Sequence, residues 1–343
     1  MRIVYMGTPD FAVLPLKKLY EAGHEICGVF TQPDRQKGRG KKFLPSDVKV
    51  AAEELGLDIY QPEKLRDEES VSILRKLSPD IIVVAAYGQI LSEEVLSLPK
   101  YGCINIHASL LPKYRGASPI EASILSGDEK TGVTIMYMAK GLDTGDIISQ
   151  ADILIGKHNT ETLTAELSKL GADLVVKTIS DIEAGTATRT VQNEEESCYA
   201  GKLDKAMGQL DFTKTAVELE RLVRAFYPWP CAYTSMDGKT LKILEAQCIP
   251  ADETDEVFIK MKKQLGDEFA DRLLSGRFEA ADGSSTDIIG RVIGVNKKIF
   301  AVGTGDGALV FTKLQPEGKK PMDTVAFLNG YKVEAGTVLK ATM

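Results

Sequence analysis

The sequence predicts an α/β fold in which a doubly wound domain precedes a smaller domain of β-strands. Three observations lead to this prediction: a length of 343 residues, alternating strand and helix patterns in the first half, and short β-like runs after about residue 209. Domains usually have about 100–200 residues, so this length fits two of them. We place the first domain at 1–189, a linker at 190–207 and the second domain at 208–343.

The first domain is predicted from four short apolar runs rich in Ile and Val, which are typical of buried parallel strands. These runs are residues 2–6, 25–31, 80–86 and 102–107. Helical patterns alternate with them at 11–22, 46–55, 69–77 and 92–96. Ser46 is a suitable N-cap for the second helix. The segment after Gly7 lacks G-x-G-x-x-G, so the doubly wound shape does not indicate a dinucleotide site.

The second domain is predicted from a change of pattern after a long helix at 160–184 and a polar stretch with three consecutive glutamates. One further helix is expected at 217–226. The β-like runs that follow are 241–244, 290–295, 299–302 and 309–314. Such short strands predict a small β-barrel-like domain.

Several classes of protein are disfavoured by the composition. The five cysteines are scattered without a C-x-x-C pair, and the three histidines are not spaced as metal ligands, so we expect neither disulfides nor a metal. The first apolar run is too short for a signal peptide or a membrane span, so we expect a cytoplasmic protein. The net charge of −7 is uneven, because residues 33–45 carry five basic side chains and one acidic one.

The candidate chemistry lies in residues 102–148. Asn105 and His107 are two positions apart on a predicted strand, so their side chains share one face at its carboxyl end. An Asn amide can stabilise an oxyanion, a His can accept a proton, and Asp143 in the turn GLDTGD can orient the imidazole. No Ser or Cys is placed as a nucleophile, which favours direct acyl or formyl transfer to an amine.

Each of these residues also has a structural explanation when it is taken alone. A strand-end His is commonly a packing residue, and Asn105 and Asp143 suit turns or caps. The basic run can be a solvated face of the protein. The combination of Asn105, His107 and Asp143 is what favours a catalytic interpretation.

Nine motifs occur along almost the whole chain in the order typical of one family. They are MGTPDFA at 6–12, FTQPDR at 30–35, GRGKK at 38–42, AAYGQIL at 85–91, INIHASLLPKYRGASPI at 104–120, TGVTIM at 131–136, GLDTGDI at 141–147, RAFYPWP at 224–230 and LQPEGKKPM at 314–322. With these motifs the sequence resembles the methionyl-tRNA formyltransferases. The resemblance implies a Rossmann-like formyl-folate domain followed by a barrel similar to oligonucleotide-binding domains.

The resemblance also implies roles for particular residues. Asn105, His107 and Asp143 match the catalytic triplet of enzymes that use 10-formyltetrahydrofolate. The residues that match the formyl-folate-binding stretch or are expected to line its pocket are Ser109, Leu110, Leu111, Pro112, Tyr87 and Gly88. Arg39, Lys41 and Lys42 match a basic loop that contacts the tRNA acceptor stem. The implied reaction is formylation of methionyl initiator tRNA by a protein that we expect to be a monomer, without a metal or a membrane partner.

Two alternatives remain. A formyltransferase acting on a small amine, such as a sugar nucleotide or glycinamide ribonucleotide, would share the triplet but would not need both the basic loop and the barrel. A catalytically inactive RNA-binding protein would keep the loop and barrel without needing the triplet.

Residues 251–285 depart from the family pattern as an acidic amphipathic insertion. Its apolar side chains recur every fourth residue at Val257, Met261, Leu265, Phe269 and Leu273. We expect a peripheral helical excursion whose removal leaves the reaction nearly unchanged.

Overall fold

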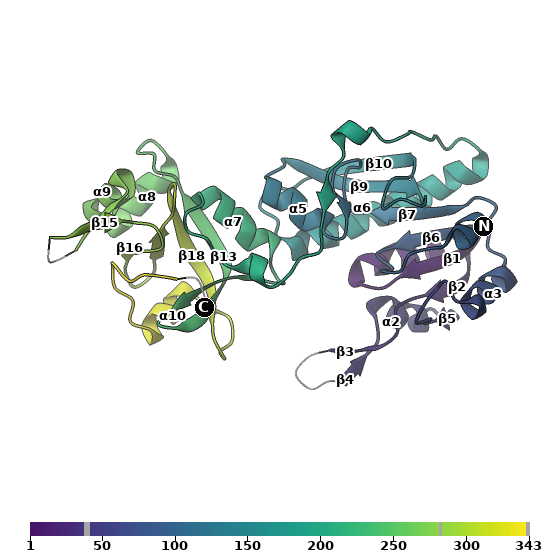
Figure 1. Cartoon of the computed structure of the whole chain (residues 1–343), viewed down its shortest axis with the longest axis horizontal. Helices are drawn as coiled ribbons and strands as arrows, with labels where there is room; N and C mark the ends of the chain where they lie inside the picture. The colour runs from purple at the N-terminus through teal and green to yellow at the C-terminus, as the bar shows by residue number, and fades with distance from the viewer. Residues whose placement is uncertain (38–41, 281–282, 341–343) are drawn as a thin grey trace. The chain divides into compact units, whose positions relative to one another are not determined.

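The computed structural model describes residues 1–37, 42–280 and 283–340, which form two compact units (Figure 1). The first unit contains residues 1–123, 128–156 and 162–202. The second contains residues 124–127, 157–161 and 203–343.

The first unit is built on a seven-stranded sheet with the order β10-β9-β7-β6-β1-β2-β5. Its strands are β1 (Arg2–Gly7), β2 (Glu25–Phe30), β5 (Ile59–Tyr60), β6 (Ile81–Ala85), β7 (Cys103–His107), β9 (Lys130–Tyr137) and β10 (Ile147–Leu154). The first five run parallel, as the apolar runs predict, whereas β9 and β10 add an antiparallel edge. The doubly wound α/β prediction is therefore confirmed.

Helices pack against this sheet and leave its carboxyl edge to the connecting loops. They are α1 (Val13–Glu21), α2 (Asp47–Glu54), α3 (Glu68–Leu77), α4 (Glu93–Ser97), α5 (Pro119–Ser126) and α6 (Thr160–Ala184), with short 3-10 turns at Asp10–Ala12 and Glu194–Glu196. The Ser46 hydroxyl accepts a hydrogen bond from the Lys49 amide, so its predicted capping of α2 is confirmed. The core between the sheet and helices α3 and α4 includes Val4, Val84 and Leu74.

Two small strand pairs lie outside the main sheet. The antiparallel pair β3 (Arg35–Lys37) and β4 (Lys42–Leu44) flanks the basic segment. The parallel pair β8 (Arg115–Gly116) and β11 (Tyr199–Ala200) joins two parts of the first unit. The expected linker 190–207 is therefore bound to the first unit as far as residue 202, because strand pairing and side-chain hydrogen bonds hold it there.

The second unit contains an antiparallel sheet with the order β12-β13-β18-β17-β16, to which β19 is added beside β18. Its strands are β12 (Ala232–Met236), β13 (Lys239–Ile249), β16 (Val292–Val295), β17 (Phe300–Gly303), β18 (Ala308–Pro316) and β19 (Met322–Asp323). Its helices outside the insertion are α7 (Ala216–Ala225) and α10 (Thr324–Gly330), with a 3-10 turn at Ala206–Gly208. A capping box of Thr215 and Glu218 begins α7. The small antiparallel β domain agrees with the predicted fold class.

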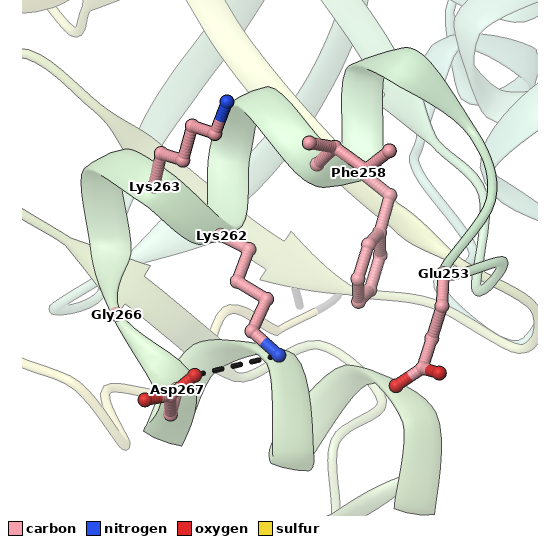
Figure 2. A pocket seen from close by; sticks show the side chains of 7 residues that line it. Glu253, Phe258, Lys262, Lys263, Gly266 and Asp267 are labelled. Carbon is pink, nitrogen blue, oxygen red and sulfur yellow. Dashed lines mark ion pairs between the residues drawn. The ribbon is translucent and has the colours of Figure 1, made fainter.

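Residues 251–285, which were expected to be an acidic insertion, form two helices and a hairpin: α8 (Glu256–Leu265), α9 (Asp267–Ser275), β14 (Arg277–Glu279) and β15 (Ser285–Asp287). The helix breaks at Gly266, whose φ of 89° favours glycine. Between α8 and α9 lies a hollow of about 500 Å³ in which Lys262 Nζ and Asp267 Oδ1 are 3.4 Å apart (Figure 2). Charged side chains and the apolar Phe258 and Ile259 line this hollow. Met261, Phe269 and Leu273 of the apolar stripe are buried in the core.

The expectation that the insertion is peripheral is wrong. Phe258, Phe269 and Leu273 are at most 2 % exposed and belong to one core cluster with Ile293 and Val310 of the sheet. Removing residues 251–285 would leave that apolar face of the sheet in water, at a cost of roughly 25 cal/mol for each Å² exposed. The insertion is therefore part of the core of the second unit.

We expect Phe258→Ala to destabilise the second unit by about 3–5 kcal/mol, because it empties a fully buried aromatic site. Ile259→Ala is the matched control, since the next side chain on α8 is 39 % exposed and should cost about 1 kcal/mol or less. Urea unfolding followed by the fluorescence of Trp229, the only tryptophan in the sequence, measures both. Equal midpoints for the two variants would contradict this role of the insertion.

Candidate active site

The site is built around the end of strand β7. Residues 103, 105 and 107 alternate onto one face of the sheet, so Asn105 and His107 share a face as predicted. His107 is the last residue of the strand and is buried, whereas Asn105 is only half-buried. Among the residues that the structure describes, the Asn105 side chain has no hydrogen-bonding partner, so its amide can serve a ligand.

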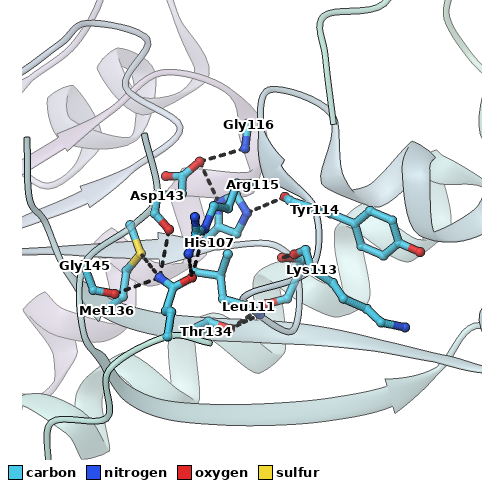
Figure 3. Close-up of polar contacts among 12 residues, drawn as sticks. His107, Leu111, Lys113, Tyr114, Arg115, Gly116, Thr134, Met136, Asp143 and Gly145 are labelled. Atoms are coloured by element: carbon cyan, nitrogen blue, oxygen red, sulfur yellow. Dashed lines mark hydrogen bonds and ion pairs between the residues drawn. The ribbon is translucent and has the colours of Figure 1, made fainter. Parts of the chain in front are cut away.

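The imidazole of His107 is held from both sides (Figure 3). Its Nε2 lies 2.9 Å from the carbonyl oxygen of Tyr114. A carbonyl can only accept, so in the neutral ring Nε2 carries the hydrogen and Nδ1 keeps its lone pair. Nδ1 faces Asp143, with 3.8 Å to Oδ2. The basic nitrogen of His107 therefore lies beside a carboxylate that can stabilise a positive charge on the ring.

Asp143 lies in the turn between β9 and β10, and its side chain is 12 % exposed. Its Oδ2 accepts a hydrogen bond of 2.8 Å from the backbone amide of Gly116. Its backbone has a φ of 53°, a left-handed conformation that Asp tolerates better than most residues. The structure thus brings His107 and Asp143 together, although 36 residues separate them in the chain.

Sequence reasoning missed a second layer of residues behind Asp143. The Gln192 amide nitrogen donates to the carbonyl oxygens of Asp143 and Gly145, at 2.8 and 2.7 Å. Its oxygen accepts two hydrogen bonds from the guanidinium of Arg115, at 3.0 and 2.9 Å. Arg115 also forms a bidentate pair with Glu194, which raises the pKa of Arg115 and lowers the pKa of Glu194. No periodic signal marks Gln192 or Glu194, because their partners lie 47 to 79 residues away.

The stretch predicted to bind formyl-folate has two kinds of residue. Ser109 and Leu111 are buried, and the Ser109 hydroxyl donates to the carbonyl of Lys113 at 2.6 Å. The Leu111 amide donates to Thr134 Oγ1 at 3.0 Å. Leu110 and Pro112 are half-buried. Buried members of the stretch therefore fix the loop, while the half-buried ones retain surface that a ligand can contact.

Tyr87 and Gly88 line a hollow of about 330 Å³ at the carboxyl edge of the sheet. Other contributors are Thr8 after β1 and Gln32 after β2, so loops from three adjacent parallel strands meet there. Such an edge is where open α/β sheets bind ligands. The Tyr87 hydroxyl is buried without a partner in the described structure, and burial raises its pKa.

The predicted tRNA-contacting residues Arg39 and Lys41 lie outside the described residues, and Lys42 is described only by its backbone in β4. Within the described ranges, no group of three or more His, Cys, Asp or Glu side chains could hold a metal ion. In the same part of the chain, no helix has both the length and the apolar character to cross a bilayer.

Comparison with known proteins extends these observations. The family model described as "Formyl transferase" matches residues 1–179, and the one described as "Formyl transferase, C-terminal domain" matches residues 202–332. The methionyl-tRNA formyltransferase of Lachnospira eligens is 45 % identical, with 99 % of both chains covered. That of Alkaliphilus metalliredigens is 44 % identical, covering 99 % of this chain and 98 % of its own. The chain belongs to the methionyl-tRNA formyltransferase family.

A solved structure has the same fold at much lower sequence identity. The N-formyltransferase from Helicobacter canadensis, in complex with folinic acid and dTDP-3-aminofucose, superposes with a TM-score of 0.59 at 17 % identity. It covers 92 % of this chain and 99 % of its own. At this identity the likeness shows the shared fold alone.

Proposed function

We propose that this protein transfers the formyl group of 10-formyltetrahydrofolate to the amino group of methionyl initiator tRNA. The observation that carries the proposal is the match, along almost the full chain, to relatives named for this activity. The geometry supports it, because Asn105, His107 and Asp143 form a site for acyl transfer to an amine.

The described contacts suggest a role for each side chain. When the amine nitrogen attacks the formyl carbon, a C–N bond forms and the carbonyl electron pair moves to oxygen, where the Asn105 amide donates a hydrogen bond. His107 Nδ1 takes a proton from the attacking nitrogen, while Asp143 stabilises the imidazolium and Tyr114 fixes the ring. Collapse restores the carbonyl and breaks the bond to folate N10, which receives the proton from His107.

The substrates would be bound by different parts of the chain. Formyl-folate would contact Leu110 and Pro112 and the hollow lined by Tyr87 and Gly88. The tRNA would contact Arg39, Lys41 and Lys42. We propose that the protein is a cytoplasmic monomer. We also propose that the reaction needs no metal, since side chains stabilise the oxyanion and transfer the proton.

A competition assay tests the proposed function. The protein and 10-formyltetrahydrofolate are mixed with charged initiator tRNA, free methionine, a sugar-nucleotide amine and glycinamide ribonucleotide. Formylation of the methionyl-tRNA alone is expected. Transfer only to a small amine would support the alternative formyltransferase, and no transfer at all would point to an inactive RNA-binding protein.

The basic segment, residues 33–45, leads to a separate prediction about how tRNA affinity depends on salt concentration. Replacing Arg39, Lys41 and Lys42 together by Ala should reduce the slope of log affinity against log salt by about 2–3, since each cation neutralises about one phosphate. Arg39→Ala should have the largest single effect, because a guanidinium can bond two acceptors. Affinity for charged initiator tRNA at several salt concentrations measures the slope.

The matched control is the pair Lys17→Ala and Lys18→Ala on α1, where each lysine faces an acidic partner, Glu54 or Glu21. Removing these charges should leave the salt slope unchanged. An unaltered slope and normal turnover in the triple variant would show that the basic segment is only a solvated connection.

A further inference from the structure

Residues 190–200, here called the strap, lie between the ranges matched by the two family models, 1–179 and 202–332. The strap is bound along its length to the first unit. Thr190 forms two backbone hydrogen bonds with Ile147 of β10, at 2.8 and 2.9 Å. At the other end, β11 pairs with β8. A segment with the composition of a linker is thus anchored at both ends to the first unit.

The two residues that face the ring nitrogens of His107 share an uncommon backbone conformation. Tyr114, beside Nε2, has a φ of 61°, and Asp143, beside Nδ1, has a φ of 53°. Left-handed conformations are uncommon outside glycine and persist where surrounding contacts hold them. The position of both groups relative to His107 therefore depends on what supports these two turns.

The strap supplies that support. Cys198 accepts the Tyr114 amide at Sγ, at 3.2 Å, and the Arg115 amide at its carbonyl, at 2.9 Å. Gln192 donates to the carbonyls of Asp143 and Gly145. Each of the two left-handed residues is therefore hydrogen-bonded to the strap as well as facing His107.

Gln192 closes a ring of contacts around Asp143. Its oxygen is bonded to the Arg115 side chain, and its nitrogen to the backbone of Asp143, whose carboxylate returns to the amide of Gly116. Gly116 has a φ of 117°, and a Cβ there would lie 2.5 Å from the carbonyl oxygen of Ala200. Only glycine therefore allows this close approach of strap and site. Gln192 is 6 % exposed, and both its polar atoms are engaged.

We propose that Gln192 is a positioning residue for the formyl transfer, which holds the Asp143 turn so that the carboxylate stays beside His107. The inference rests on the proposed function and concerns the same site. Gln192 would act through Asp143 and touch neither substrate. Arg115 and Glu194 would serve as the outer support that orients the Gln192 amide.

The test uses Gln192→Glu in the full-length protein. The new side chain has nearly the same shape and still accepts from Arg115, but it can no longer donate to the two turn carbonyls. We expect kcat for methionyl-tRNA formylation to fall about 100-fold, the loss typical of a misplacement of about 1 Å. The KM values for both substrates should change little. Asn193→Asp, which makes the same chemical change at an exposed neighbour bonded to Glu196, should keep normal kcat.

A double-mutant cycle separates positioning from general damage to the fold. In an Asp143→Ala background, Gln192→Glu should lower kcat by no more than about twofold, since coupled residues are not additive. A second loss of about 100-fold in that background, or normal kcat in the single variant, would overturn the inference. Wild-type protein is measured in parallel. If it does not formylate methionyl-tRNA, the proposed function fails instead, so the two failures are distinguishable.

Discussion

The variant His107→Ala should lose about 10²–10⁴-fold in kcat for formylation, because it removes the ring nitrogen that we propose takes the proton from the attacking amine. In the structure Nδ1 is free to act as the base, since Nε2 is bonded to the Tyr114 carbonyl. The affinity for tRNA should be nearly unchanged, because a buried side chain at the end of β7 contacts no phosphate. Single-turnover formylation and a tRNA-binding titration measure the two quantities.

His24→Ala is the control for this experiment. His24 lies in the turn after α1, and burial is the main cause that lowers its pKa. Its loss should leave turnover within about twofold of the wild type, as is usual for substitutions away from the chemistry. Should His107→Ala retain most of its activity, the base would have to be sought elsewhere, and the tautomer argument would fail with it.

A comparably large effect is expected at Asn105. Asn105→Ala should reduce kcat by about 10²–10³-fold, the usual loss when one oxyanion donor is removed. Asn105→Asp should be worse than Asn105→Ala, because a carboxylate repels the developing oxyanion instead of donating to it. The order of these two variants is the informative result.

The measurement is kcat for each variant together with the affinity for 10-formyltetrahydrofolate. An interaction made mainly in the transition state lowers kcat and leaves substrate affinity largely intact. If Asn105→Asp were the more active variant, the side chain would be serving as a proton acceptor or a packing group, and its oxyanion role would be withdrawn.

Much of the doubly wound architecture can be predicted from the sequence, because buried parallel strands are nearly continuous apolar runs. The runs at 2–6, 80–86 and 102–107 coincide with β1, β6 and β7 within about one residue. The antiparallel edge strands β9 and β10 were not predicted. In β10 only Ile148 is buried, and the polar residues Ser149, Gln150 and Asp152 interrupt its apolar ones, so it has no continuous core-strand pattern.

The candidate site also contains residues that the sequence predicts and residues that it does not. Asn105 and His107 are close in sequence and follow from strand alternation, and Asp143 from its turn composition. Gln192 and Glu194 could not be predicted, since a polar segment with three consecutive glutamates is typical of a linker. Their positions depend on hydrogen bonds to residues more than 45 positions away, which leave no local pattern.

In residues 251–285 the acidic average composition does not reveal that part of the segment is buried in the core. Its acidic composition predicts a solvated excursion, yet the stripe at Met261, Phe269 and Leu273 packs against the sheet. Phe258 is the only aromatic residue on α8 and is buried, but it lies outside that spacing of four. The net charge of an amphipathic helix describes its exposed face and gives no information about its buried face.

The strap also sets an order of assembly during synthesis. Chains emerge from the ribosome amino-terminus first, and domains fold largely as they appear. When residue 189 has emerged, every strand of the seven-stranded sheet is available, including the one that carries His107. The supports of Tyr114 and Asp143 arrive later, with Gln192 and Cys198. A nascent chain can therefore complete its sheet before its active site, and catalytic competence is the last property that the first unit acquires.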